Sequence, residues 1–237
     1  MQLTDCKDCP YNFNMPAKYS IKQYLSNSYY HIFNRGVEKR KIFQDSQDYK
    51  VFLSYLKDYL ETKNIEELRN RLLNPVTTSK EKDKLLKLIR LNNFHGEIQL
   101  LAYCLMPNHF HLLVKQKSQM SIDSFMKSLL TRYTIFFNKK YKRVGHLFQG
   151  RYKAVVVKNE EQLLHLSRYI HLNPARTVLA ICYSSLNDYL KRINTSWIKK
   201  DEILNYFSKT NPLLSYENFM KESKTGENEL IQSLVFA

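Results

Sequence analysis

The chain has 237 residues, of which 43% are hydrophobic, so it is long enough to bury a sizeable core and is not disordered overall. Its net charge of +15 predicts an anionic partner, most often a nucleic acid. No apolar run has the length of a membrane span, and residues 1–10 lack the pattern of a signal peptide, so we expect a cytoplasmic protein without membrane contact.

Residues 1–27 are expected to form an irregular lead-in. Cys6 and Cys9 lie there as a C-x-x-C pair, but a single pair is weak evidence for zinc, and an ordinary reduced segment is favoured. The stretch SYYHIFNRG, residues 28–36, then predicts a strand that ends at Gly36.

The next segment predicts helices. Asp45 and the polar residues after it open a helix in which apolar residues recur at helical spacing up to Leu60. Residues 61–97 then mix basic and acidic side chains with leucines, and Asn74-Pro75 interrupts them. This composition indicates a helical insertion with solvated faces and no catalytic pattern.

Two histidines occupy the second arm of a predicted hairpin. Residues 98–106 and 109–116 indicate strands, and Pro107-Asn108 indicates the turn between them. Alternate side chains of a strand share a face, so His109 and His111 point the same way, at a separation that one divalent cation can bridge. Two ligands rarely hold a metal by themselves, so core histidines with hydrogen-bonded rings are an open alternative.

Much of the positive charge follows the hairpin. Between Lys115 and Lys158 there are eleven lysine or arginine residues and one acid, Asp123, interleaved with aromatic residues. Cations can follow a phosphate backbone while aromatic rings stack on unpaired bases. Part of this pattern belongs to an amphipathic helix over residues 121–141, and residues 148–157 predict a basic strand after it.

The last well-defined predicted helix begins after Asn159, its expected N-cap, and runs to Pro174. Tyr169 and Asn173 are four residues apart and share one face of it. The proline disfavours helical geometry at Asn173, so the helix is expected to open there. From position alone, Tyr169 is one of 17 tyrosines and Asn173 simply ends a helix.

The order strand, helix, hairpin, helix, strand, helix predicts an α+β fold, an antiparallel sheet with helices packed on one face. We expect a lead-in over 1–27, a main domain over 28–190 with an insertion at about 61–97, and a C-terminal extension of helices and loops over 191–237.

Four motifs together resemble one family. YHIFNRG (30–36), LLAYCLMPNHFHLLV (100–114), HLFQGRYKA (146–154) and YIHLNPAR (169–176) stand in the order seen in HUH-type single-tyrosine transposases. Within that family the chain is most similar to the REP-associated tyrosine transposase branch of the insertion-sequence transposases. The resemblance covers roughly residues 28–190.

The resemblance implies a ferredoxin-like, RRM-like catalytic core that cuts and rejoins single-stranded or hairpin DNA. It implies a divalent metal, Mg²⁺ or Mn²⁺, bound by His109, His111 and Asn173, and Tyr169 as the nucleophile that forms a 5′-phosphotyrosine. A homodimer and a monomer are equally compatible with it, and some relatives take the tyrosine from a partner subunit. Our candidates for binding DNA phosphates are Arg35, Arg132, Lys139, Lys142, Arg143, Arg151 and Lys153.

Two other functions stay open. A domesticated transposase could bind nucleic acid on the same fold without catalysis, and a metal-dependent phosphodiesterase could activate water in place of the tyrosine.

Overall fold

A computed structural model describes residues 24–173, 183–221 and 234. The segment with Cys6 and Cys9 lies outside these residues. The bounds of the described strands and α-helices, in chain order, are β1 Ser28–Arg35, α1 Ser46–Leu60, α2 Ile65–Leu73, α3 Ser79–Arg90, β2 Ile98–Met106, β3 His109–Gln116, α4 Ser121–Lys140, β4 Lys153–Val156, α5 Glu160–Leu172, α7 Leu186–Tyr189, α8 Asp201–Leu204 and α9 Tyr216–Lys221.

The four strands form one antiparallel sheet in the order β2-β3-β1-β4. With the helices between them, the strands follow the β-α-β-β-α-β order of ferredoxin-like folds, with α2 and α3 inserted before β2. The predicted α+β fold with an antiparallel sheet is therefore confirmed. The predicted hairpin is also confirmed, with β2 and β3 joined at Pro107-Asn108.

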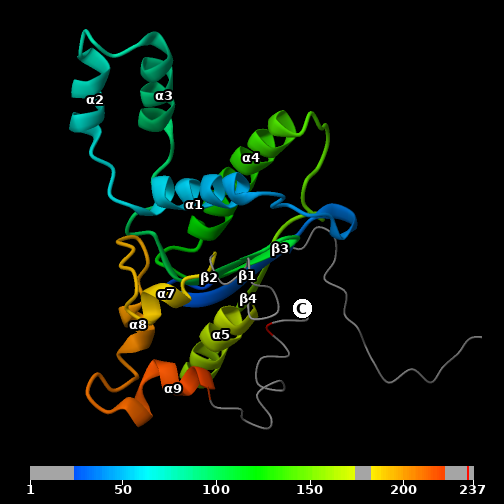
Figure 1. Cartoon of the computed structure of the whole chain (residues 1–237), viewed down its shortest axis with the longest axis vertical. Helices are drawn as coiled ribbons and strands as arrows, with labels where there is room; N and C mark the ends of the chain where they lie inside the picture. The colour runs from blue at the N-terminus through cyan, green and yellow to red at the C-terminus, as the bar shows by residue number, and fades with distance from the viewer. Residues whose placement is uncertain (1–23, 174–182, 222–233, 235–237) are drawn as a thin grey trace, which may run out of the picture.

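Helices cover both faces of the sheet, whereas we expected them on one. Figure 1 shows α1 and α4 on one side and α5 with the C-terminal helices on the other. Side chains on both sides of β2 and β3 are mostly buried, and most of them are apolar, so each face needs a cover. Phe110 and Leu113 lie on opposite faces: Phe110 belongs to a core with α1 and α4, and Leu113 to a second core with α5.

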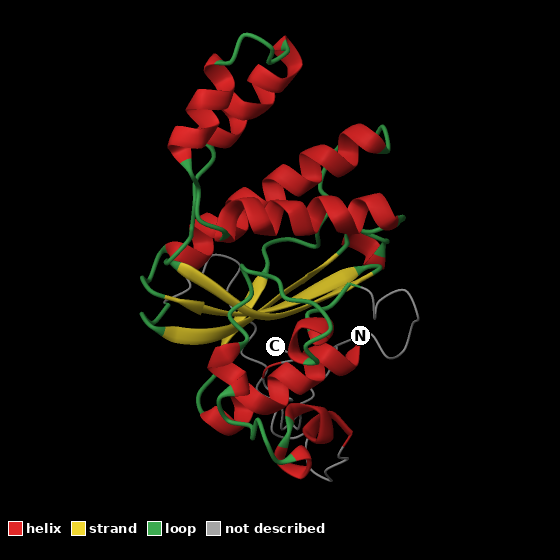
Figure 2. Ribbon diagram, turned by 60° about the vertical axis from the view of Figure 1, so that its left-hand side comes forward, coloured by secondary structure: helices red, strands yellow, loops and turns green. Residues whose placement is uncertain are grey.

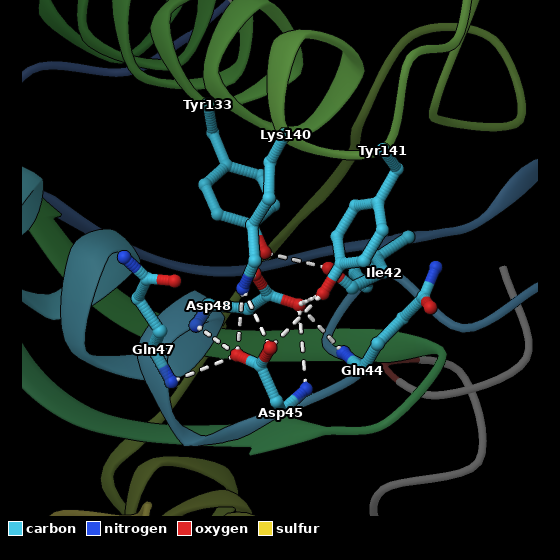
Figure 3. A network of polar contacts seen from close by, with 8 residues as sticks. All are labelled: Ile42, Gln44, Asp45, Gln47, Asp48, Tyr133, Lys140 and Tyr141. Carbon is cyan, nitrogen blue, oxygen red and sulfur yellow. Dashed lines mark hydrogen bonds and ion pairs between the residues drawn. The ribbon is translucent and has the colours of Figure 1, made fainter.

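A buried polar network joins α1 to α4 (Figure 3). The Asp48 side chain is fully buried in the first turn of α1, where its Oδ2 accepts a hydrogen bond from the Gln44 backbone N–H at 2.7 Å. From the end of α4, Lys140 donates to Asp48 at 2.7 Å, and the Tyr141 hydroxyl donates to it at 2.8 Å. This network fixes how the two helices lie on the sheet.

The C-terminal helices pack beside α5 and also contact the sheet, where the Tyr189 hydroxyl of α7 donates to the Leu101 carbonyl of β2 at 3.1 Å. His171 of α5 bonds through Nδ1 to the Tyr216 hydroxyl and through Nε2 to the Ser185 hydroxyl, both at 2.7 Å. Tyr189 and Tyr216 are buried in the same core as Leu166 of α5. Helix α5 is therefore held within one chain by the sheet and by the C-terminal helices, and Figure 2 shows helices on both faces of the sheet.

The ends of two predicted elements differ from expectation. The strand predicted over 148–157 is regular at 153–156 alone, because Gly150 takes a φ of 70° and breaks the extended run. At the end of α5, Asn173 keeps helical angles, φ −51° and ψ −42°, although it precedes Pro174. Its backbone N–H still donates to the Tyr169 carbonyl, so the two residues remain one helical turn apart.

The predicted insertion contains two helices, α2 and α3, which project away from the sheet in Figure 1. Lys63 anchors the base of this pair by donating to the carbonyls of Ile89 and Leu91 at 2.8 and 2.7 Å. Across the described residues, none of the helices has the length and apolar character needed to cross a bilayer.

Candidate functional site

The two histidines of β3 lie on the sheet face that α5 covers. Their ring centroids are 5.1 Å apart and their planes are nearly perpendicular, at 89°. His111 is buried and His109 partly buried. The two histidines therefore share a face, as strand alternation predicted. Each ring also has a protein partner at its Nδ1 atom, so the alternative of hydrogen-bonded rings is partly met.

The Nδ1 of His111 lies 2.8 Å from Nε2 of His31, a buried histidine of β1. The Nδ1 of His31 in turn lies 2.7 Å from the carbonyl oxygen of Leu234. Burial lowers the pKa of His31 to about 4, although the hydrogen bond with Leu234 acts to raise it. Burial, and secondly the neighbouring imidazoles of His31 and His109, take the pKa of His111 well below its ordinary value. Both rings are therefore neutral at neutral pH.

His109 has a separate partner. Its Nδ1 lies 2.6 Å from Oδ1 of Asn108, the turn residue before it. Burial, and secondly the charge of Arg35, lower the pKa of His109 to about 4. A neutral imidazole is the form that binds a metal ion, so all three rings are in the right state for ligation or for supporting it.

Tyr169 lies beside these imidazoles in the same chain. Its ring centroid is 5.6 Å from that of His111 and 6.5 Å from that of His31, in edge-on arrangements of 86° and 80°. Leu166 and Ile170 of α5 are buried against the sheet, so the helix presents the half-buried Tyr169 to the histidines. The structure therefore brings the predicted nucleophile and the predicted histidine pair together.

Asn173 follows Tyr169 by one turn. Its Nδ2 atom is buried and has no hydrogen-bond partner within the described part of the chain. A buried amide atom without a partner requires an explanation. The nitrogen and oxygen of an amide can exchange places by a flip of the side chain, so the same position could hold the oxygen. An ion bound by that oxygen is one explanation.

The donor set fits a divalent cation. Two neutral imidazoles and one amide oxygen suit Mn²⁺, and the oxygen donors of a phosphate would suit Mg²⁺ as well. Over residues 24–173, 183–221 and 234, no group of three or more His, Cys, Asp or Glu side chains could hold a metal ion. A metal at this site would consequently need the amide of Asn173 and donors from outside the protein.

The predicted phosphate-binding residues are divided between the two sides of the sheet. Arg35 is the register partner of His109, and Lys153 that of Phe33, so both stand on the face of the histidines. Arg132 instead lies on α4, where Asp58 binds it at 2.8 Å and the Tyr55 ring stacks at 3.7 Å. The remaining four come from the end of α4 and the loop after it, namely Lys139, Lys142, Arg143 and Arg151.

Sequence reasoning missed His31. Alternation along β1 does put His31 and Arg35 on one face, but nothing in the sequence tells which face of β1 meets the histidines of β3. That relation comes from the β1–β3 register, in which Phe33 is paired with His111.

The family model described as "Transposase IS200 like" matches residues 68–173. The matched range contains His109, His111, Tyr169 and Asn173 and leaves out β1 with His31. No curated protein matches the chain.

Three solved structures show partial likeness. A REP-associated tyrosine transposase bound to a REP hairpin has 10% identity and a TM-score of 0.44, over 76% of this chain and 96% of that chain. A candidate transposase from Deinococcus radiodurans R1 has 16% identity and a TM-score of 0.35, over 64% and 95%. The tRNA(His) guanylyltransferase of Saccharomyces cerevisiae has 10% identity and a TM-score of 0.31, over 91% and 80%.

Proposed function

We propose, from the match of residues 68–173 to the IS200-like transposase family model, that the protein is a metal-dependent endonuclease and strand transferase for single-stranded hairpin or repeat DNA. The observation that carries the proposal is the position of Tyr169, whose ring lies 5.6 Å from that of His111 on the covered face of the sheet. A tyrosine beside neutral imidazoles that can hold a metal ion supports metal-assisted phosphoryl transfer to its hydroxyl.

The reaction exchanges one phosphoester for another. The Tyr169 oxygen attacks the scissile phosphorus and forms a new P–O bond, while the bond from phosphorus to the 3′-oxygen breaks. The phenol loses its proton and the departing 3′-oxygen gains one, which leaves a 5′-phosphotyrosine and a free 3′-hydroxyl. Because the new ester keeps the phosphodiester's bond type, a second 3′-hydroxyl can reverse the step and join two strands.

His109, His111 and Asn173 would hold the divalent metal in this proposal. When bound, Mg²⁺ or Mn²⁺ supplies polarisation of the scissile phosphate and offsets charge in the transition state. The chain's own contribution is placement: β3 fixes the two imidazoles, and α5 holds Tyr169 and Asn173 one turn apart.

DNA would reach this site across a basic surface. Arg35 and Lys153 stand on the histidine face and are our first candidates for contact with the phosphates next to the cut. Lys139, Lys142, Arg143 and Arg151 are candidates for phosphates farther along the strand. Arg132 is the least suited of the set, since Asp58 already neutralises it.

The test is to incubate a single-stranded hairpin with the protein and Mn²⁺ or Mg²⁺ and to look for a covalent protein–DNA adduct on a denaturing gel. We expect an adduct with the wild type and none with Tyr169→Phe, because the phenol oxygen is the attacking atom. Tyr206→Phe, which alters a half-exposed tyrosine of the C-terminal segment, is the matched control and should form the adduct normally.

Three outcomes would contradict the proposal. An adduct with Tyr169→Phe would mean that another residue attacks. Hairpin binding that survives His109→Ala and His111→Ala, with no cleavage by the wild type, would identify a binding module, and cleavage without covalent protein would identify a water-activating phosphodiesterase.

A further inference from the structure

Each histidine of β3 has its Nδ1 atom next to a fixed acceptor, and the two acceptors come from distant parts of the chain. We propose that Asn108 and His31 are positioning residues that hold His109 and His111 in the Nδ1–H tautomer, so that both Nε2 atoms offer lone pairs to one cation. This inference rests on the proposed function, because it takes the two imidazoles as ligands of the metal.

The direction of the His109 hydrogen bond follows from the amide of Asn108. The Nδ2 of Asn108 lies 3.3 Å from the carbonyl oxygen of Lys39, and a carbonyl can only accept. The amide nitrogen therefore points to Lys39, and Oδ1 points to His109 at 2.6 Å. An amide oxygen also only accepts, so the proton lies on Nδ1 of His109.

The loop that carries the Lys39 carbonyl is itself fixed against the β2–β3 turn. The Gly36 backbone N–H donates to the Asn108 carbonyl at 2.9 Å. At Gly36 a Cβ atom would lie 2.3 Å from the Arg40 carbonyl oxygen, so the chain can fold back there only because the residue is a glycine. The acceptor for Asn108 is thus held in place by backbone contacts.

The same reasoning gives the direction of the hydrogen bonds that involve His31. The Leu234 carbonyl must accept, so Nδ1 of His31 carries the proton of that 2.7 Å contact. In a neutral ring the other nitrogen, Nε2 of His31, is then an acceptor. It lies 2.8 Å from Nδ1 of His111, with the ring planes within 15° of each other, so His111 donates its Nδ1–H along the plane of the rings.

The Nε2 atom is left free in both His109 and His111. In the described part of the chain, the hydrogen bonds of His109 and His111 involve Nδ1, and neither Nε2 atom has a protein hydrogen-bond partner. A metal-binding histidine usually donates its other ring N–H to a fixed acceptor, which sets its tautomer and orientation. Asn108 and His31 fill this role from the turn and from β1.

The experiment starts with the metal-free full chain labelled with ¹⁵N, whose imidazole spectra report which ring nitrogen carries the proton. We expect His109 and His111 both to be protonated at Nδ1 and bare at Nε2. Asn108→Leu removes the acceptor for His109, and His31→Phe removes the acceptor for His111. In each variant the affected histidine should also populate the Nε2–H tautomer, and Mn²⁺ binding should weaken by about 10- to 100-fold.

Two rescue variants separate positioning from bulk. Asn108→Asp keeps an acceptor oxygen and His31→Gln keeps both a donor and an acceptor, so each should retain the wild-type tautomer and bind Mn²⁺ more tightly than its apolar counterpart. Asn70→Leu on α2 and His146→Gln in the exposed loop after α4 are the matched controls and should change neither readout.

Several results would overturn the inference: a wild-type spectrum with a proton on Nε2 of His109 or His111, a wild type that binds no Mn²⁺, or apolar variants that keep both tautomers and the Mn²⁺ affinity. If His31→Phe does not fold, the wild-type spectrum and His31→Gln still decide. Failure of the proposed function has another signature, namely normal tautomers and bound Mn²⁺ with no adduct on hairpin DNA.

Discussion

The carboxylate of Glu202 joins the C-terminal helices to the sheet. It accepts hydrogen bonds from the Tyr29 hydroxyl at 2.6 Å and from the Lys115 ammonium at 3.0 Å, so one side chain of α8 contacts both β1 and β3. Burial acts to raise the pKa of Glu202, but the hydrogen bonds from Tyr29 and Lys115 outweigh it, and the pKa lies below its usual value of 4.5.

We predict that Glu202→Gln lowers the free energy of unfolding by about 1 kcal/mol at pH 7, because a charged acceptor is lost at a partly exposed pair. The folded-state pKa is the lower one, so the carboxylate stabilises the fold above about pH 4.5, and this contribution disappears as the pH falls through the folded pKa. Urea unfolding at pH 7 and pH 3 measures it. If the free energies of unfolding of wild type and variant differed equally at both pH values, the role of the charge would be contradicted. Glu217→Gln on α9 is the exposed control.

Individual site residues differed in how far the sequence could predict them. The shared face of His109 and His111 follows from strand alternation alone, and the structure has it. The roles of Tyr169 and Asn173 came from the resemblance, since spacing could not select them among many similar residues. His31 was not predictable, because a strand's pattern does not say which neighbouring strand each face will meet.

A buried ion pair, in addition to apolar contacts, joins helices α1 and α4 at one end. The Asp48 carboxylate is fully buried, and Lys140, which reaches it from α4, has a side chain 20% exposed. Hydrogen bonds from Lys140 are also shared with Asp45, the N-cap of α1 (Figure 3). Removing the lysine would leave a buried carboxylate with fewer partners.

We predict that Lys140→Met destabilises the protein by about 2–3 kcal/mol, less than a complete loss of buried pairing, because Tyr141 and the Gln44 backbone still donate to Asp48. Lys139→Met removes the adjacent, exposed charge and should stay within about 0.5 kcal/mol of wild type. Thermal and urea unfolding of the two variants give the comparison. Similar stabilities would show that the buried pair contributes little.

The elements themselves were largely predictable from local pattern. Turn residues Pro107 and Asn108 located the hairpin, and the Asp45 cap located the start of α1. The strand before α5 was predicted too long because Phe148 and Tyr152 are aromatic, as strand residues often are, although Gly150 between them turns the chain. Packing on both faces was missed because it depends on the C-terminal helices, whose polar sequence hides how they cover α5.

Several cations lie near the candidate site at the scale of the whole molecule. Arg35 and Lys153 are on the histidine face, and the loop with Lys142 and Arg143 adjoins the same end of β1, since Val37 donates to the Leu147 carbonyl at 3.0 Å. The α2–α3 pair carries lysines too, but they lie on the projecting insertion (Figure 1). A strand that reaches the candidate site would therefore meet the first group of cations.

We predict that Arg35→Gln weakens hairpin binding and reduces the slope of log affinity against log salt by about one, as expected for the loss of one phosphate contact. Lys84→Gln on α3 removes an exposed charge of the same sign and should leave both quantities unchanged. Binding titrations at several salt concentrations measure both. Equal effects of the two variants would mean that net charge, rather than position, determines binding.

The most direct test of the central claim is peptide mapping of the covalent adduct formed by the wild type on hairpin DNA with Mn²⁺. After nuclease and protease digestion, the account predicts a 5′-phosphonucleotide on the peptide that contains Tyr169. The same modification on another tyrosine, such as Tyr152 or Tyr133, or cleaved DNA with no modified peptide, would contradict it.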